Sequence, residues 1–354
     1  MATKKAKQDE WAKELKTKAS VEERLFTVDG GAALLVVGLR ALHHARRGDK
    51  ALDEVPIEGL PADTTTPTPC AASADGLVAG VDRRGAQLLL IGRDAKVAAV
   101  VHHPDLAHAQ SALVAPSGDE VVIVTDASTG AARVPARVYA APAASLREGG
   151  ALTCLAELPY RPSVAYDDTG RLCWVESGRL TVRERDELRT TPIHTAIDRA
   201  TLRGATSTTV CSLLSPAHLR VAGDRCVARD SLHGGDYFVF DRAGNVLRTF
   251  TGLLCERLAL LPGGRTLVLT AARAKDRTGS ADYVQWPDPR TREAYVGVFD
   301  TDSGDIRDLV ERSAGYTRAF AMIDETSAAI ASDVRGGGAR IEIVRFSTGD
   351  GILA

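Results

Sequence analysis

A short polar turn recurs along this chain, and no other feature restricts the fold as strongly. The turns are about 40 to 60 residues apart, and each lies between two short runs of alternating apolar residues. Intervals of this length are typical of β-propellers, in which each blade is a sheet of four short strands. The turns lie at Asp29-Gly30, Asp75-Gly76, Ser117-Gly118, Thr169-Gly170, Gly223-Asp224, Gly263-Gly264 and Asp324-Glu325. We therefore predict an all-β fold, a seven-bladed β-propeller.

Residues 163 to 193 show one repeat most completely. Four alternating segments, separated by tight polar turns, are expected to form the four strands of one blade. These segments are 163–166, 171–175, 179–183 and 187–193. The third and fourth strands repeat most clearly near the C-terminus, where an alternating strand is followed by a glycine turn at Gly244, Gly304 and Gly349.

The first 23 residues differ in composition from the rest. Six of the nine lysines lie within the first 18 residues. Trp11, Ala12, Leu15, Lys18 and Ala19 have the spacing of one helical face, which predicts a short N-terminal α-helix. We therefore assign residues 1–23 to a lysine-rich helix and residues 24–354 to the propeller. The helix could cap the propeller, or dock to an acidic partner or a membrane surface. With every strand inside residues 24–354, the first and last blades would close by face packing, without exchange of a terminal strand.

Two segments resemble the WD-repeat and related bacterial β-propeller families. In those families a strand often ends in Val-Phe-Asp before a Thr-Gly or Ser-Gly turn. Here the segments are Val298-Phe299-Asp300-Thr301-Asp302-Ser303-Gly304 and Val239-Phe240-Asp241-Arg242-Ala243-Gly244. The resemblance covers most of residues 24–354 and implies the propeller architecture.

Signatures of catalysis and of cofactor binding are missing from the sequence. It contains no GxSxG elbow, no Walker A loop and no HExxH motif. The pairs His43-His44 and His102-His103 cannot each chelate one metal, because adjacent strand residues point to opposite faces. Asn245 is the only asparagine, whereas calcium-dependent propeller hydrolases use asparagine and carboxylate ligands. We expect no catalytic residue, no cofactor and no metal site, and the balance favours a protein that is not an enzyme.

Composition suggests where the protein works. No apolar run approaches the length of a membrane span, and residues 1–20 are too polar for a secretory peptide, so we expect a cytoplasmic protein. Residues 19–354 contain 38 lysines and arginines against 43 acidic residues, a net charge of -5, which argues against a nucleic-acid partner. Cys70, Cys154, Cys173, Cys211, Cys226 and Cys255 are scattered in apolar runs. They are expected to be buried free thiols rather than disulfides or zinc ligands.

The long connections suggest a binding face. Each long connection joins an outer strand to the first strand of the next blade, or a second strand to a third strand. In a propeller, connections of these two kinds lie on the same rim. The long connections are residues 59–69, 195–216 and 272–292. Because loops carry recognition, we expect this rim to bind another protein, although insertions without function are the alternative. The insertion in blade 6 has the composition of binding hot spots, and its basic residues suggest an acidic partner. Its partner-binding candidates are Arg273, Lys275, Arg277, Tyr283, Trp286, Arg290 and Arg292. Alternatively, Trp286 packs on the propeller itself.

These observations favour a non-catalytic protein-interaction scaffold, adaptor or regulatory subunit that presents loops on one rim. Two alternatives stay open at this stage. One is a propeller hydrolase or lyase that uses residues at the mouth of the central channel. The other is a sensor of a small ligand in that channel.

Overall fold

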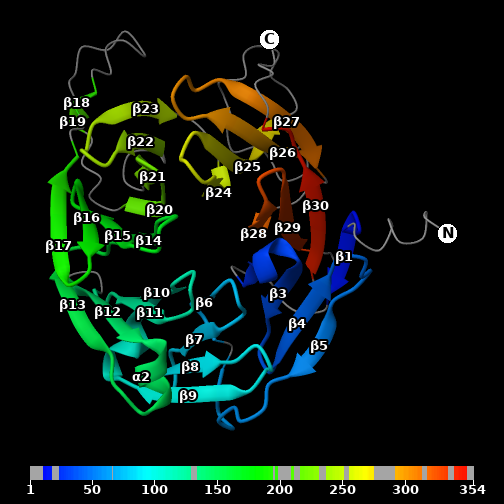
Figure 1. Ribbon diagram of the computed structural model, residues 1–354, viewed down its shortest axis with the longest axis vertical. Coiled ribbons are helices and arrows are strands. Elements are labelled where there is room, and N and C mark those ends of the chain that lie inside the picture. The colour runs from blue at the N-terminus through cyan, green and yellow to red at the C-terminus, as the bar shows by residue number, and fades with distance from the viewer. Residues whose placement is uncertain are drawn as a thin grey trace. The chain divides into compact units, whose positions relative to one another are not determined.

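The strands of this protein form seven four-stranded sheets, which are the blades of a β-propeller (Figure 1). The predicted all-β fold and the predicted number of blades are confirmed. The computed structural model describes residues 11–17, 24–65, 67–128, 134–193, 196–197, 209–210, 216–230, 237–250, 255–274, 292–312, 317–333 and 339–348. The chain divides into two compact units: Met1–Pro159 with Arg312–Ser347, and Tyr160–Glu311 with Thr348–Ala354.

Unit 1 contains blades 1, 2, 3 and 7. Blade 1 consists of β2 (Leu25–Val28), β3 (Ala33–Val37), β4 (Ala41–Arg46) and β5 (Asp53–Pro56). Blade 2 consists of β6 (Cys70–Ala72), β7 (Val78–Asp82), β8 (Gln87–Ile91) and β9 (Val97–His102). Blade 3 consists of β10 (Ala109–Val114), β11 (Glu120–Thr125), β12 (Ala136–Pro142) and β13 (Thr153–Leu158). Blade 7 consists of β28 (Thr317–Asp324), β29 (Ser327–Asp333), β30 (Ala339–Arg345) and β1 (Glu14–Thr17). Three short helical segments join strands of this unit: η1 (Asp29–Gly31), η2 (Pro104–His108) and α2 (Ala143–Arg147).

Unit 2 contains blades 4, 5 and 6. Blade 4 consists of β14 (Ser163–Tyr166), β15 (Leu172–Glu176), β16 (Arg179–Glu184) and β17 (Glu187–Pro192). Blade 5 consists of β20 (Pro216–Ala222), β21 (Arg225–Asp230), β22 (Tyr237–Asp241) and β23 (Val246–Phe250). Blade 6 consists of β24 (Cys255–Leu260), β25 (Thr266–Ala274), β26 (Arg292–Asp300) and β27 (Ile306–Arg312). A small sheet of β18 (Ala196–Ile197) and β19 (Thr209–Val210) lies between blades 4 and 5 in the sequence. The strands of blade 4 match the predicted segments to within two residues at each end.

The N-terminal segment differs from the prediction. Residues 14–17 form strand β1 instead of a helix, and β1 pairs antiparallel with β30 as the fourth strand of blade 7 (Figure 1). The chain ends therefore do exchange a strand. Trp11 and Leu15 are buried in one apolar cluster with Leu25 of blade 1 and Ile341 of blade 7. The physical reason is that the edge of β30 leaves backbone groups unpaired, and β1 supplies their partners.

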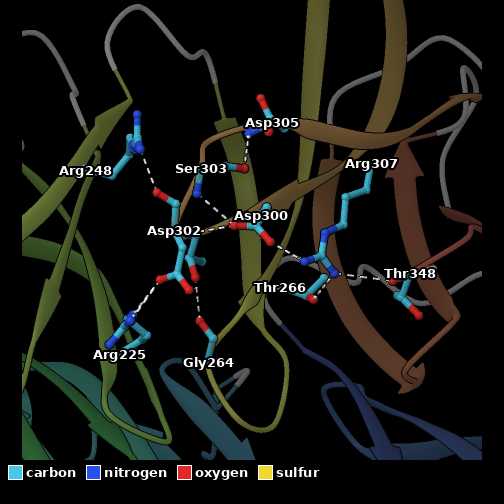
Figure 2. Close-up of polar contacts among 11 residues, drawn as sticks. Arg225, Arg248, Gly264, Thr266, Asp300, Asp302, Ser303, Asp305, Arg307 and Thr348 are labelled. Carbon is cyan, nitrogen blue, oxygen red and sulfur yellow. Dashed lines mark hydrogen bonds and ion pairs between the residues drawn. The ribbon is translucent and has the colours of Figure 1, made fainter. Parts of the chain in front are cut away.

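Residues 298–304, one of the two segments that resemble the WD-repeat turn, lie in blade 6 and form hydrogen bonds with blade 5 (Figure 2). The Asp300 carboxylate accepts hydrogen bonds from the backbone amides of Asp302 and Ser303, both at 2.8 Å, and so closes the turn. Asp302 then reaches blade 5, where its Oδ1 accepts from Nη2 of Arg225 at 2.8 Å and its carbonyl accepts from Arg248 at 2.6 Å. The turn is therefore structural: it orients one hairpin and fixes it to the neighbouring blade.

The cysteines agree only partly with the prediction. Cys173 and Cys226 are buried free thiols, and Cys70 is a partly buried one. Cys154 is exposed, because it lies on β13, the outer strand of blade 3. Cys211 and the side chain of Cys255 lie outside the described residues. In the part of the chain that the structure describes, no helix is long and apolar enough to cross a membrane.

Candidate functional site

Most of the predicted partner-binding residues lie outside the described residues. These are Lys275, Arg277, Tyr283, Trp286 and Arg290. The backbones of Arg273 and Arg292 are described, in the last two pairs of the β25–β26 ladder. The structure thus places the two ends of the insertion and neither confirms nor contradicts its role.

The first strands of blades 4, 5 and 6 run in the same direction through unit 2. The turns that follow them meet: the amide of Gly223 donates to Asp168 Oδ2 at 2.8 Å, and Gly223 lies against the carbonyl of Gly263. Because their ends are together, the starts of β14, β20 and β24 lie together at the opposite end of the unit. The end of β25 is at that same end, since Cys255 at the start of β24 pairs with Ala271. The insertion between β25 and β26 therefore begins and ends at the end of blade 6 that lies beside the starts of β14, β20 and β24.

Strand β20 is distorted near its start by a β-bulge at His218. Ala217 pairs with Arg229 and Arg220 pairs with Val227, so that His218 and Leu219 together face one residue of β21. His218 has a φ of 56°, a left-handed conformation that non-glycine residues seldom adopt. The amide of Leu219 donates to Ser163 Oγ of β14 at 2.9 Å, which holds the bulge against blade 4. Bulges re-aim side chains and are frequent beside functional sites.

The charges of four arginines of unit 2 act on His218, and we call Arg161, Arg220, Arg229 and Arg257 the arginine cluster. Burial lowers the pKa of His218, and the charges of these four guanidinium groups lower it further, to about 3. The imidazole is therefore neutral at pH 7. Arg161 precedes β14 and Arg257 lies near the start of β24, and both strands are neighbours of β20.

Arg229 is the best-defined member of the arginine cluster. It lies directly opposite Tyr237 in the β21–β22 ladder, and its guanidinium carbon is 6.0 Å from the centre of the tyrosine ring. Tyr237 is 1% exposed, so the ring is a fixed support for the cation. Among the described residues, the buried Nε of Arg229 has no hydrogen-bond partner. A buried donor without a partner carries a free-energy cost that an incoming acceptor would remove.

Unit 1 shows the same preference for arginine at the starts of first strands. Arg24 immediately precedes β2, and Arg318 is the second residue of the neighbouring strand β28. Arg24 is only 6% exposed, and its Nε has no hydrogen-bond partner within the described ranges. This recurrence is the sequence signal that could have indicated the arginine cluster.

A second group of polar side chains, in unit 1, connects a short helix to two strands. The Asp105 carboxylate of η2 accepts from the Tyr139 hydroxyl, and from Arg137 Nη1 at 2.6 Å. Arg137 Nε also donates to Glu157 at 2.7 Å. These contacts hold η2 against strands β12 and β13. The charged side chains pair with one another, so we assign the group a structural role. Among the described residues, no three histidines, cysteines or acidic residues are placed to hold a metal ion.

The arginine cluster can bind anions. Guanidinium groups donate two parallel hydrogen bonds to carboxylate or phosphate and stay charged at every physiological pH. The neutral His218 adds a polar group without adding charge.

Comparisons with known proteins agree with the fold. No family model and no curated protein sequence matches the chain. The β-propeller domain of Cps50 (Swd1) from Myceliophteria thermophila is similar in structure, with a TM-score of 0.60 and 11% identity over 94% of this chain and 100% of that one. A virginiamycin B lyase from Staphylococcus aureus has a TM-score of 0.57 and 12% identity over 94% of this chain and 98% of that one. A streptogramin B lyase has a TM-score of 0.59 and 8% identity over 94% of this chain and 97% of that one. At these identities the likeness shows a shared β-propeller fold and no specific family.

Proposed function

We propose that this protein is a non-catalytic binding scaffold, adaptor or regulatory subunit that holds an acidic segment of a partner protein. The observation that carries the proposal is the arginine cluster, four cations from three blades at one end of unit 2. Such a concentration of guanidinium groups favours a ligand with several negative charges.

The rest of unit 2 suits a rigid binding platform. Antiparallel ladders hold the strands, and the carboxylates of Asp300 and Asp302 fix the hairpins at the far end. Ligand binding then costs little conformational free energy in the backbone, because Arg220, Arg229 and Arg257 extend from paired strands. We propose that this end belongs to the partner-binding rim.

The insertion of blade 6 is a second part of the proposal. Its ends, Arg273 and Arg292, lie at the same end of blade 6 as Arg257. Tyr283 and Trp286 are proposed as aromatic anchors, and Lys275, Arg277 and Arg290 as further cationic contacts. Trp286→Ala should weaken partner binding without lowering the melting temperature. A large loss of stability would show that Trp286 packs on the propeller.

A labelled, glutamate-rich peptide is a direct probe of the arginine cluster. Fluorescence anisotropy should show binding of this peptide, with an affinity that falls as salt increases, and no binding of its lysine-rich counterpart. Arg257→Gln should weaken binding at least about tenfold. Arg189→Gln, on the exposed face of β17, is the matched control and should bind as the parent protein does. Equal binding by both variants would contradict the proposal.

A further inference from the structure

The four charges of the arginine cluster act on one side chain, His218. Arg161 lies just before blade 4, Arg220 and Arg229 lie in blade 5 and Arg257 lies in blade 6, and all four act on the same imidazole. Arg220 and Arg229 also share one face of blade 5, because Arg220 pairs with Val227, two residues from Arg229. Charges that act together at one position favour a ligand, or a partner segment, that carries one compact and highly charged group.

We propose that the arginine cluster is a binding site for a phosphate monoester. The inference extends the proposed function, on which it rests, from acidic segments in general to one anion. The phosphate could be carried by a side chain of the partner segment or by a small phosphate ester, because the same chemistry recognises both.

The charge and the number of acceptors distinguish the two candidate anions. A carboxylate carries one charge, and one guanidinium group in a bidentate pair satisfies both of its oxygens. A phosphate monoester carries about -1.5 to -2 charges at pH 7 and has three strong acceptor oxygens. Several guanidinium groups around one point suit the second anion, and clusters of arginines are a recurrent way to bind it.

Two details of the site support the same ligand. The buried Nε of Arg229 has no acceptor among the described residues, and the guanidinium carbon lies 6.0 Å from the centre of the Tyr237 ring, which helps to hold the cation in place. His218 is held in place by the bulge and remains neutral beside four cations. It can therefore donate an N–H to an oxygen without competing for the negative charge.

The test uses four ligands with the full-length protein and isothermal titration calorimetry. They are a glutamate-rich peptide containing one phosphoserine, the same peptide with glutamate at that position, the same peptide with serine, and free O-phosphoserine. We expect the phosphopeptide to bind at least about tenfold more tightly than the glutamate peptide. Weaker binding of free O-phosphoserine would indicate a phosphorylated partner segment, whereas equal affinity would indicate a small phosphate ester.

Two variants assign the binding to the site. Arg229→Lys keeps the charge but loses the planar fork, and should abolish most of the preference for phosphate. His218→Asn keeps a residue that tolerates the left-handed conformation, and should weaken phosphopeptide binding while leaving the fold intact. Arg189→Gln is the control and should change neither affinity.

Failure can be attributed to one proposal or the other. If the glutamate peptide and the phosphopeptide bind equally, the phosphate inference is wrong while the proposed function stands. If no acidic peptide binds but O-phosphoserine does, the proposed function is wrong and the site takes a small phosphate ester. If none of the ligands binds, both proposals are overturned.

Discussion

Arg242 of blade 5 donates from Nη2 to the carboxylate of Asp167 in blade 4 at 2.7 Å, and the side chain of Asp167 is completely buried. The arginine follows the third strand of its blade, and the aspartate follows the first strand of the blade before it. Arg93 of blade 2 and Asp29 of blade 1 lie in the corresponding two turns and form an ion pair at 2.6 Å, but there the side chains are 53% and 25% exposed. One arrangement thus recurs in buried and in exposed form.

This pair of sites predicts unequal losses of stability. Arg242→Gln should lower the free energy of unfolding by about 3 kcal/mol, because it leaves a buried carboxylate without its partner in the next blade. Arg93→Gln should lower it by less than about 1 kcal/mol, because water solvates both partners there. Urea unfolding of the two variants makes the comparison, and equal losses would show that burial does not control the contribution of the ion pair.

The N-terminal strand should be essential for stability. Leu15 is fully buried between blades 7 and 1, so Leu15→Ala should cost about 2 to 5 kcal/mol. Deletion of residues 2–17 should cost more, because it also removes Trp11 and leaves the edge of β30 unpaired. Thermal and urea unfolding are the measurements. Lys13→Ala, at an exposed side chain, is the control and should change stability by less than about 0.5 kcal/mol. An unchanged melting temperature for the deletion variant would contradict the role of β1.

His218 should make the protein less stable as the pH falls below 6.5. Its pKa is about 3 in the folded protein and 6.5 in the unfolded chain, so between these values only the unfolded chain binds the proton. The free energy of unfolding then decreases by up to about 1.4 kcal/mol per pH unit as the pH falls. Burial opposes ionisation of Asp167, but hydrogen bonds from Thr169, Arg171 and Arg242 outweigh it and lower its pKa to about 2. Asp167 therefore lowers stability only below pH 3.8.

The measurement is the free energy of unfolding at a series of pH values for the parent protein and for His218→Asn. The variant should remove the decrease above pH 4 that comes from His218. The charged groups that act on the imidazole are Arg161, Arg220, Arg229 and Arg257. Parallel curves for the two proteins would falsify the assignment.

The turns that follow the first strands should be sensitive to small additions of volume. Gly223 has a φ of 55°, and a Cβ there would lie 2.7 Å from the carbonyl oxygen of Gly263 in blade 6. Gly170 has a φ of 81° in the turn of blade 4, but a Cβ there would meet nothing within 4 Å. Gly170→Ala should cost about 1 to 2 kcal/mol from backbone strain alone. Gly223→Ala should cost about 1 to 3 kcal/mol more, because the neighbouring turn must move. Unfolding experiments that show equal costs would mean that the two turns are not in contact in solution.

The number of blades was predictable from sequence because each strand and each turn is a local feature. In residues 163–193, alternating side chains and polar turns locate all four strands without knowledge of the rest of the chain. Asp300 was likewise visible in its motif, since it bonds to amides two and three residues away.

The structure of the N-terminal segment was not predictable in the same way. Trp11 and Leu15 are four residues apart, a spacing that fits one face of a helix, and nothing nearby opposes that interpretation. The segment is a strand because β30, more than 300 residues along the chain, has an edge that needs a partner.

The sequence alone determined the repeating architecture, because hydrophobic alternation and turn chemistry act over a few residues. Only the tertiary structure decided where charge gathers. Arg161 and Arg257 are about a hundred residues apart in the chain, and the recurrence of arginine near the starts of first strands does not by itself show that their charges act together. They act on the same imidazole because three first strands run side by side, and Coulomb forces depend on distance through space rather than on separation along the chain.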